Sequence, residues 1–219
     1  MLGKLGKLGV DLFFPRKCLN CGKEGQYICD ECSLFINELG AFGDVGVFEY
    51  NGIIQKALKE VKYRYTKDIL NELIEKAFQI ILDNNNRYRF NDFLSFLVNE
   101  KPVVTYVPMY KKKERYRGFN QSEMIARKIG EVFNLEVIGL LKKTRETKSQ
   151  TKLNKEERFR NVQSSVTNTA AFDTELSNIS TVLLVDDIFT TGATMNECKR
   201  VLREMGIENI RGFTLARTT

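Results

Sequence analysis

The sequence predicts an α/β protein in which helices flank a parallel β-sheet and a small cysteine-rich domain precedes the sheet. Four apolar residues in a row, 182–185, are typical of a strand covered on both faces, as inner strands of a parallel sheet are. Apolar runs at 103–107 and 207–215 predict further strands, and stretches with helical spacing of apolar residues separate them. We therefore expect residues 1–45 to form an N-terminal helix and a four-cysteine zinc-binding domain (a small zinc finger), and residues 46–219 to form the sheet domain.

Residues 2–14 place leucines and Phe13 near one face of a short helix, which Pro15 ends. Such a helix either docks on the rest of the protein, which we favour for so short and glycine-rich a segment, or lies on a membrane surface. It lacks the continuous apolar core and the small-residue cleavage site of a signal peptide, and no stretch of the chain approaches the length of a membrane span. These features predict a cytoplasmic protein without a membrane span.

Two Cys-x-x-Cys pairs, Cys18 with Cys21 and Cys29 with Cys32, are separated by seven residues. Each pair forms a tight knuckle, and two knuckles supply four thiolates at the corners of a tetrahedron. In a cytoplasmic protein this pattern favours a metal over disulfides, and zinc over iron on frequency alone. Because four protein ligands leave no open position for water, the expected Zn²⁺ is structural. The fifth cysteine, Cys198, falls on a predicted helix, where we expect it to pack in the core.

Between the cysteines and residue 103 the sequence predicts a strand and helices. A strand at 45–50 leads into an apolar-periodic stretch at 53–61, whose polar side carries several cations and a single acid, Glu60. That face is either an ordinary solvated surface, which we favour, or a nucleic-acid patch. Residues 69–82 have the apolar spacing of a core helix, and a further apolar run at 90–98 precedes Pro102.

The run at 103–107 predicts the first strand of the sheet, and a basic loop with interleaved aromatic residues follows it, ahead of a helix that extends to about residue 133. The positive side chains of this loop are Lys111, Lys112, Lys113, Arg115 and Arg117. Ligands of α/β proteins bind at this end of the strands. We expect the loop to hold a pyrophosphate, or to let single-stranded bases stack on its aromatic rings while its cations meet phosphates; a plain solvated loop is the alternative.

Two adjacent carboxylates, Asp186 and Asp187, stand where the strand over 182–185 is expected to end. A short loop of small residues then feeds a helix over about 194–205, so that backbone N–H groups and the helix dipole make a phosphate cradle. Acids in front of such a cradle would repel a phosphate, but they can accept hydrogen bonds from hydroxyl groups. A sugar phosphate carries hydroxyl groups as well as a phosphate, so it suits both parts of the site. The alternative is a buried strand that ends in an ordinary acidic turn. The loop residues are Thr190, Thr191, Gly192, Ala193 and Thr194.

The bulk composition narrows the classes of function. There is no histidine in 219 residues, which excludes Ser-His-Asp and Cys-His nucleophilic systems, histidine-ligated metals and imidazole proton shuttles. The formal net charge of +6 points weakly toward polyanionic partners.

The segment 182–194, V-L-L-V-D-D-I-F-T-T-G-A-T, resembles the loop of type I phosphoribosyltransferases that binds phosphoribosyl diphosphate (PRPP), and it matches every position of that pattern. The resemblance implies a type I phosphoribosyltransferase-like sheet domain over 46–219. It implies that Asp186 and Asp187, the candidate catalytic residues, hold the ribose 2′- and 3′-hydroxyls. Residues 190–194 would hold the 5′-phosphate, and Mg²⁺ would accompany PRPP.

Three separated motifs, in the same order, are similar to those of the ComF (ComFC-type) family over about residues 15–216. They are the Cys-x-x-Cys pairs, R-G-F-N-Q-S-E at 117–123, and Q-T-K-L-N-K-E-E-R-F-R-N-V at 150–162. That family joins a zinc finger to a phosphoribosyltransferase domain and is associated with DNA uptake in natural transformation. The resemblance implies that Arg117 and Asn120 belong to the pyrophosphate-facing loop, and that residues 143–161 form a mobile loop that closes over the site.

Three functions remain open from the sequence. We favour a ComF-like protein that binds a PRPP-type ligand and single-stranded DNA during cytoplasmic handling of incoming DNA, with a DNA translocase or helicase of the uptake system as partner. The basic residues at 111–117, and Arg158 within the basic segment 142–160, would then contact the DNA. The alternative is an active phosphoribosyltransferase that joins PRPP to a nucleobase or another nitrogen nucleophile, a reaction that needs no histidine. A duplex-DNA regulator with PRPP as effector ranks last, because no helix-turn-helix is visible.

Overall fold

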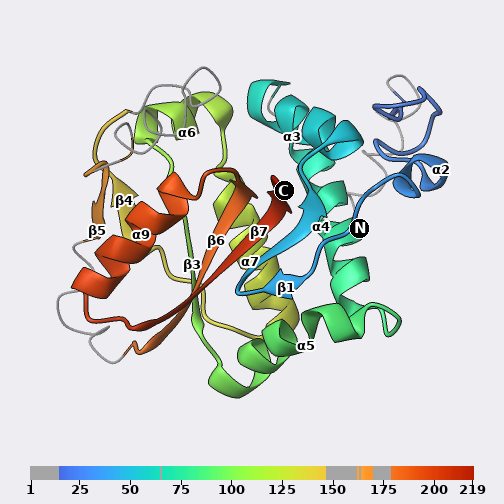
Figure 1. Cartoon of the computed structure of the whole chain (residues 1–219). Coiled ribbons are helices and arrows are strands. Elements are labelled where there is room, and N and C mark those ends of the chain that lie inside the picture. Colours follow the sequence, from blue (N-terminus) through green and yellow to red (C-terminus); the bar gives the residue numbers. More distant parts are fainter. Residues whose placement is uncertain (1–14, 65, 147–161, 163, 170–178) are drawn as a thin grey trace, which may run out of the picture.

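The computed structural model describes residues 15–64, 66–146, 162, 164–169 and 179–219 (Figure 1). The predicted helix at 2–14, Arg158 and most of the basic segment 142–160 lie outside the described residues. Within the described ranges, no helix combines the length and the apolar character that a membrane crossing requires.

A five-stranded sheet forms the centre of the fold, in the order β1-β2-β7-β6-β3. The strands β2 (Asp44–Glu49), β7 (Asn209–Arg217), β6 (Thr181–Phe189) and β3 (Val103–Tyr106) run parallel, and β1 (Ala41–Phe42) pairs antiparallel with β2. The predicted parallel sheet is confirmed. The expectation that 103–107 forms its first strand is wrong, because β2 already pairs with β7, a long-range pairing that no local pattern reveals.

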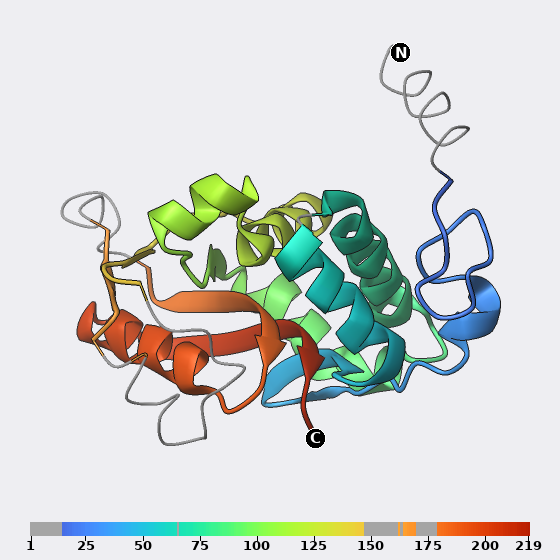
Figure 2. The ribbon, with the colours of Figure 1, turned by 90° about the horizontal axis from the view of Figure 1, so that it is seen from above.

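Helices cover both faces of the sheet (Figure 2). The helices α3 (Gly52–Arg64), α4 (Lys67–Leu82) and α7 (Gln121–Phe133) lie on one face, and α9 (Ala193–Glu204) lies on the other. Alternate side chains of β6 serve the two layers: Leu183 and Val185 join the larger hydrophobic cluster, whereas Val182 and Leu184 pack with α9. Burial on both faces explains the uninterrupted apolar run. Cys198 of α9 is fully buried in the second cluster, as expected.

Two smaller units lie at the margins of the sheet. The helix α5 (Arg87–Ser95) continues into a π-helical turn, η1 (Phe96–Glu100), which ends at Lys101 in the left-handed conformation (φ 44°) ahead of Pro102. A second, two-stranded antiparallel sheet consists of β4 (Leu141–Lys143) and β5 (Val166–Asn168), and β5 contacts α9. The first residues of the basic segment 142–160 therefore belong to a strand, although the sequence predicted a loop there.

Residues 111–117 form a helix, α6 (Lys111–Arg117), where the sequence predicted a loop. The helix ends at Gly118, whose left-handed backbone (φ 81°) lets its N–H donate to the carbonyl oxygen of Glu114. No residue of α6 is buried. The helix therefore lacks the apolar stripe by which amphipathic helices are found in a sequence, which is why the prediction failed.

Candidate active site and metal centre

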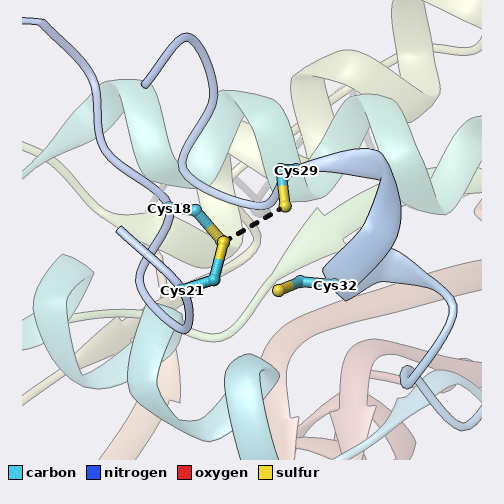
Figure 3. A group of neighbouring side chains, drawn as sticks. All are labelled: Cys18, Cys21, Cys29 and Cys32. Atoms are coloured by element: carbon cyan, nitrogen blue, oxygen red, sulfur yellow. Dashed lines mark hydrogen bonds between the residues drawn. The ribbon is translucent and has the colours of Figure 1, made fainter. Parts of the chain in front are cut away.

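Four thiols converge near the start of the described chain (Figure 3). The sulfur atoms all lie within 4.8 Å of one another, and they belong to the residues that the spacing predicted, Cys18, Cys21, Cys29 and Cys32. Tetrahedral Zn²⁺ with Zn–S bonds of about 2.3 Å separates its sulfur ligands by about 3.8 Å, so small inward movements complete the coordination. The four thiols can hold a structural zinc.

Backbone hydrogen bonds shape the first cysteine knuckle. The N–H of Gly22 donates to the carbonyl oxygen of Cys18 at 2.9 Å, and the N–H of Cys18 donates to that of Lys23 at 2.8 Å. Burial raises the pKa of the Cys18 thiol, but hydrogen bonds from the backbone of Cys21, Cys29 and Asn20 outweigh it and lower the pKa to about 6. A backbone hydrogen bond at Cys32 lowers the pKa of the Cys29 thiol, but burial and hydrogen bonds with the other cysteines outweigh it and raise that pKa to about 12. In the second knuckle, the short helix α2 (Asp30–Ser33) carries Cys32.

A carboxylate of the sheet domain anchors the second knuckle. Glu72 on α4 accepts hydrogen bonds from the N–H groups of Tyr27, at 3.1 Å, and Ile28, at 2.7 Å. The Ile28 side chain is fully buried in the larger hydrophobic cluster. The backbone next to Cys29 is thus held by a residue 44 positions from Ile28 in the sequence.

The strand β6 carries Asp186 and Asp187 beyond the end of its neighbour β3. The last residue of β3, Tyr106, pairs with Val185, whereas β6 stays paired with β7 as far as Phe189. The expectation that the acids follow the strand is wrong, since the strand continues through them. Because β3 ends before Asp186, the N-terminus of α7, and not a strand, lies against the edge of β6 at this residue.

A different helix holds each carboxylate. The hydroxyl of Ser122, in the first turn of α7, donates to Oδ1 of Asp186 at 2.9 Å, and the same oxygen accepts the N–H of Asp187 at 2.8 Å. Lys62, in the last turn of α3, places its Nζ 2.9 Å from Oδ2 of Asp187. The Lys62 and Asp187 side chains are 31% and 10% exposed, so most of this ion pair is removed from water.

Burial and the adjacent charge of Asp187 raise the pKa of Asp186 to about 7, although Lys62 and the hydrogen bonds from the Asp187 N–H and Ser122 oppose the rise. Burial lowers the pKa of Lys62, but its attraction to Asp187 and Asp186 outweighs burial and raises that pKa overall. At neutral pH the Lys62 ammonium is therefore charged, whereas the ionised form of Asp186 is less favoured than that of an ordinary carboxyl group. An ionised carboxylate accepts hydrogen bonds from hydroxyl groups, and a protonated one can also donate.

The loop between β6 and α9 turns at Gly192, which has a left-handed backbone (φ 74°). A Cβ atom on this residue would lie 2.7 Å from the ring of Phe189, so the turn requires glycine. Gly192 is the N-cap of α9, and the N–H of Ala193, the first residue of the helix, donates to the hydroxyl oxygen of Thr191 at 3.5 Å. The backbone at this end of the helix, with its positive dipole, has the chemistry of an anion site.

The predicted pyrophosphate-facing residues occupy different environments. Asn120 is buried and caps α7: its Oδ1 accepts the N–H of Ser122 at 3.0 Å, and its Nδ2 donates to the carbonyl oxygen of Val107 at 3.1 Å. Its side chain therefore positions the helix turn that holds Asp186. Arg117 is half-buried at the end of α6.

Lys143 of β4 lies within electrostatic range of Asp186, and Lys113 of α6 lies within range of Lys143. Burial lowers the pKa of Lys143, the charges of Lys113 and Arg145 lower it further, and Asp186 opposes them. Lys113 also lies 3.8 Å from Glu146. The basic helix α6 follows the carboxyl end of β3, which is the end of the parallel sheet at which the acid pair lies.

The sequence predictions missed two residues of this site, Ser122 and Lys62. Ser122 lies inside the R-G-F-N-Q-S-E motif, where its role depends on a contact across the fold with Asp186. Lys62 lies among the cations on the polar side of α3, for which a solvated surface is the favoured interpretation from the sequence. A signal was present, because the buried stripe of α3 includes Ile54 and Leu58, and Lys62 is the next position at the same spacing.

Comparison with known proteins supports this description of the site. The family model for the phosphoribosyl transferase domain matches residues 122–218, which include Ser122, the acid pair and the loop at 190–194. A solved purine phosphoribosyltransferase from Pyrococcus horikoshii is 12% identical, with a TM-score of 0.34, over 71% of this chain and 84% of its own. A likeness that low does not by itself establish a shared fold.

Three curated relatives are similar over nearly the whole chain. Competence protein ComFC of Streptococcus pneumoniae is 31% identical over 91% of this chain and 80% of its own length. Competence protein F of Haemophilus influenzae is 23% identical over 91% and 84%. Competence protein ComFC of Bacillus subtilis is 26% identical over 92% and 78%. The chain belongs to the ComFC family of competence proteins, as this similarity, the phosphoribosyl transferase match and the cysteine cluster together show.

Proposed function

We propose that the acid pair and the loop at 190–194 bind PRPP or a related sugar phosphate. Asp186 and Asp187 would accept hydrogen bonds from the ribose hydroxyls, and the loop would hold the 5′-phosphate. The observation that carries this proposal is that β6 holds both carboxylates beside the glycine turn that starts α9. Mg²⁺ would arrive with the diphosphate, whose negative charge Arg117 and the neighbouring cations of α6 would offset.

We infer a structural Zn²⁺ in the cysteine cluster, which would make residues 1–45 a zinc-binding domain and residues 46–219 the phosphoribosyltransferase-like domain. The thiol geometry supports this inference. Zinc would stabilise the fold of the two cysteine knuckles. It would have no catalytic role, since a four-thiolate site leaves no position for a reacting molecule.

The relatives are named for competence, so we propose that this protein also acts in natural transformation, where it would handle incoming single-stranded DNA in the cytoplasm beside a DNA translocase. Support for nucleic-acid binding comes from α6, on which Lys111, Lys112, Arg115 and Tyr116 are exposed. Exposed cations meet phosphates, and an exposed aromatic ring is a platform for an unstacked base. The Tyr116 side chain is 78% exposed.

A transferase activity is the second candidate. The match of residues 122–218 to the phosphoribosyl transferase domain favours it, because that segment holds the acid pair and the loop at 190–194. Release of pyrophosphate from PRPP in the presence of a panel of nucleobases and amines tests this activity. A flat response with a protein that binds PRPP would restrict the site to binding.

The decisive experiment for the proposed function titrates the zinc-loaded full chain with PRPP and Mg²⁺, with ribose 5-phosphate as a comparison, and measures single-stranded DNA binding by anisotropy at several salt concentrations. We expect saturable PRPP binding, and DNA binding that weakens as salt rises.

The α6 variant K111E/K112E/K113E should lose DNA affinity across sequences and show a shallower salt dependence. The matched control reverses three cations elsewhere, K76E/K128E/R203E, and should retain more of the affinity. Equal losses in both triple variants would refute a specific role for α6.

A further inference from the structure

Lys62 reaches the acid pair from outside the segment that matches the phosphoribosyl transferase domain. That segment begins at residue 122 and contains Ser122 as well as both acids. Lys62 belongs to α3, which precedes that segment in the chain, and its Nζ lies 2.9 Å from Oδ2 of Asp187. The N-terminal part of the chain therefore adds a charged group to a site whose acid pair and phosphate loop belong to the transferase segment.

The acids need such a counter-charge. Two neighbouring carboxylates repel each other, and burial makes the repulsion stronger, so one of them tends to remain protonated. Ser122 and the N–H of Asp187 both donate to the same oxygen of Asp186. These donors are neutral, whereas Lys62 brings a full positive charge to the second acid at salt-bridge distance.

We propose that Lys62 is a positioning residue of the ribose site: its ammonium group orients the Asp187 carboxylate and favours the ionised form of the acid pair, so that the acids can accept hydrogen bonds from ligand hydroxyls. The proposal rests on the proposed function, because it assigns a role within the same site. It extends that function by making α3 part of the ligand site.

Other titratable groups also face the acids and bear on the pH dependence. Tyr50, which follows β2, lies within electrostatic range of Lys62, Asp187 and Tyr63. From the other side of the sheet, Lys143 of β4 and Cys198 of α9 interact electrostatically with Asp186. All of these groups remain when Lys62 is replaced, so a change specific to Lys62 variants reports its own ammonium.

The matched control is Lys59, one turn earlier on α3. Its Nζ donates to Gln55 at 3.1 Å on the exposed surface of the helix. The variants K62Q and K59Q therefore remove the same unit of charge from the same helix, one beside the acids and one in solvent. K62R retains the charge at the site.

The experiment measures affinity for Mg²⁺-PRPP from pH 5.5 to 9 for the wild type and the three variants. We expect K62Q to bind about tenfold more weakly at pH 7, with its binding midpoint about one pH unit higher and its affinity partly restored at pH 9. K62R should keep the wild-type midpoint, and K59Q should be unchanged. A folded K62Q protein with the wild-type midpoint, or an equal shift in K59Q, would overturn the proposal.

Carboxylate ¹³C NMR titration of the ligand-free proteins separates this inference from the proposed function. If the wild type binds no PRPP, the proposed function fails. A raised titration midpoint of Asp186 in K62Q, absent in K59Q, would still support the positioning role. An unchanged Asp186 midpoint in K62Q would overturn it, whatever the affinity for PRPP.

Discussion

The hydroxyl of Ser122 lies 2.9 Å from Oδ1 of Asp186, and this hydrogen bond joins the first turn of α7 to the strand β6. It forms where β3 has ended, so the helix takes the place of a neighbouring strand. Asn120 supports the contact by accepting the N–H of Ser122. The motif R-G-F-N-Q-S-E is thereby linked to the acids that lie 64 positions further along the chain.

Replacement S122A removes a donor that favours the ionised form of Asp186. The pKa of Asp186, already raised to about 7 by burial and by Asp187, should rise further. We expect PRPP affinity at pH 7 to fall by about three- to tenfold and to recover toward pH 9, as measured by calorimetry. The variant S95A, at the exposed end of α5, is the control. A loss of affinity in S122A that is the same at every pH would contradict this role.

Replacement D186N should stabilise the folded protein at alkaline pH while it weakens ligand binding. A carboxyl group whose folded pKa is about 7, against an ordinary value of 3.8, binds its proton more tightly in the folded state. Its contribution to stability is therefore present near pH 4 and lost as pH rises toward 7, by about 1.4 kcal/mol for each unit of the pKa difference.

Urea unfolding of the wild type and D186N at pH 4.5 and pH 8 tests this relation. The free energy of unfolding of D186N should exceed that of the wild type at pH 8, and the excess should shrink at pH 4.5. Equal stability at pH 8 would show that Asp186 ionises there without cost.

Replacement G192A should damage the phosphate loop more than an ordinary glycine substitution does. The new Cβ would meet the Phe189 ring at 2.7 Å, in a backbone conformation that L-residues rarely adopt. The matched control is G206A, because Gly206 is also left-handed (φ 87°) but has nothing within 4 Å of a Cβ. We expect both variants to lose about 1 kcal/mol of stability, and G192A alone to lose PRPP affinity by tenfold or more.

An equal effect of G192A and G206A on PRPP binding would contradict the assigned role of the loop. Thermal unfolding separates that result from a general loss of the fold, since both proteins should remain folded at 25 °C.

Removal of zinc should loosen the cysteine knuckles before the sheet domain. The carboxylate of Glu72 holds the N–H groups of Tyr27 and Ile28. We expect a chelator to raise amide hydrogen exchange over residues 15–40 while β6 and β7 stay protected. The variant E72Q should weaken zinc retention and cost about 1–2 kcal/mol, whereas E75Q, on the exposed side of the same helix, should do neither. Uniform exchange across both regions after chelation would mean that the zinc supports the whole fold.

The sequence predicts features that depend on local patterns, and it misses contacts between segments that are distant in the chain. The apolar run of β6 and the cysteine spacing are local patterns, and both predicted their structures. The helix α6 has no buried residue, so it left no periodic signal. Lys62 and Ser122 contact the acid pair only because the fold brings distant segments together, and the pairing of β2 with β7 has the same origin.

The central claim is that Asp186 and Asp187 hold a ribose phosphate, and calorimetric titration with PRPP and Mg²⁺ tests it most directly. The zinc-loaded wild type should bind, and the variant D186N/D187N, folded by circular dichroism, should lose at least tenfold in affinity because the hydroxyl acceptors are weakened. Undiminished binding by the double variant, or no binding by the folded wild type, would contradict the account.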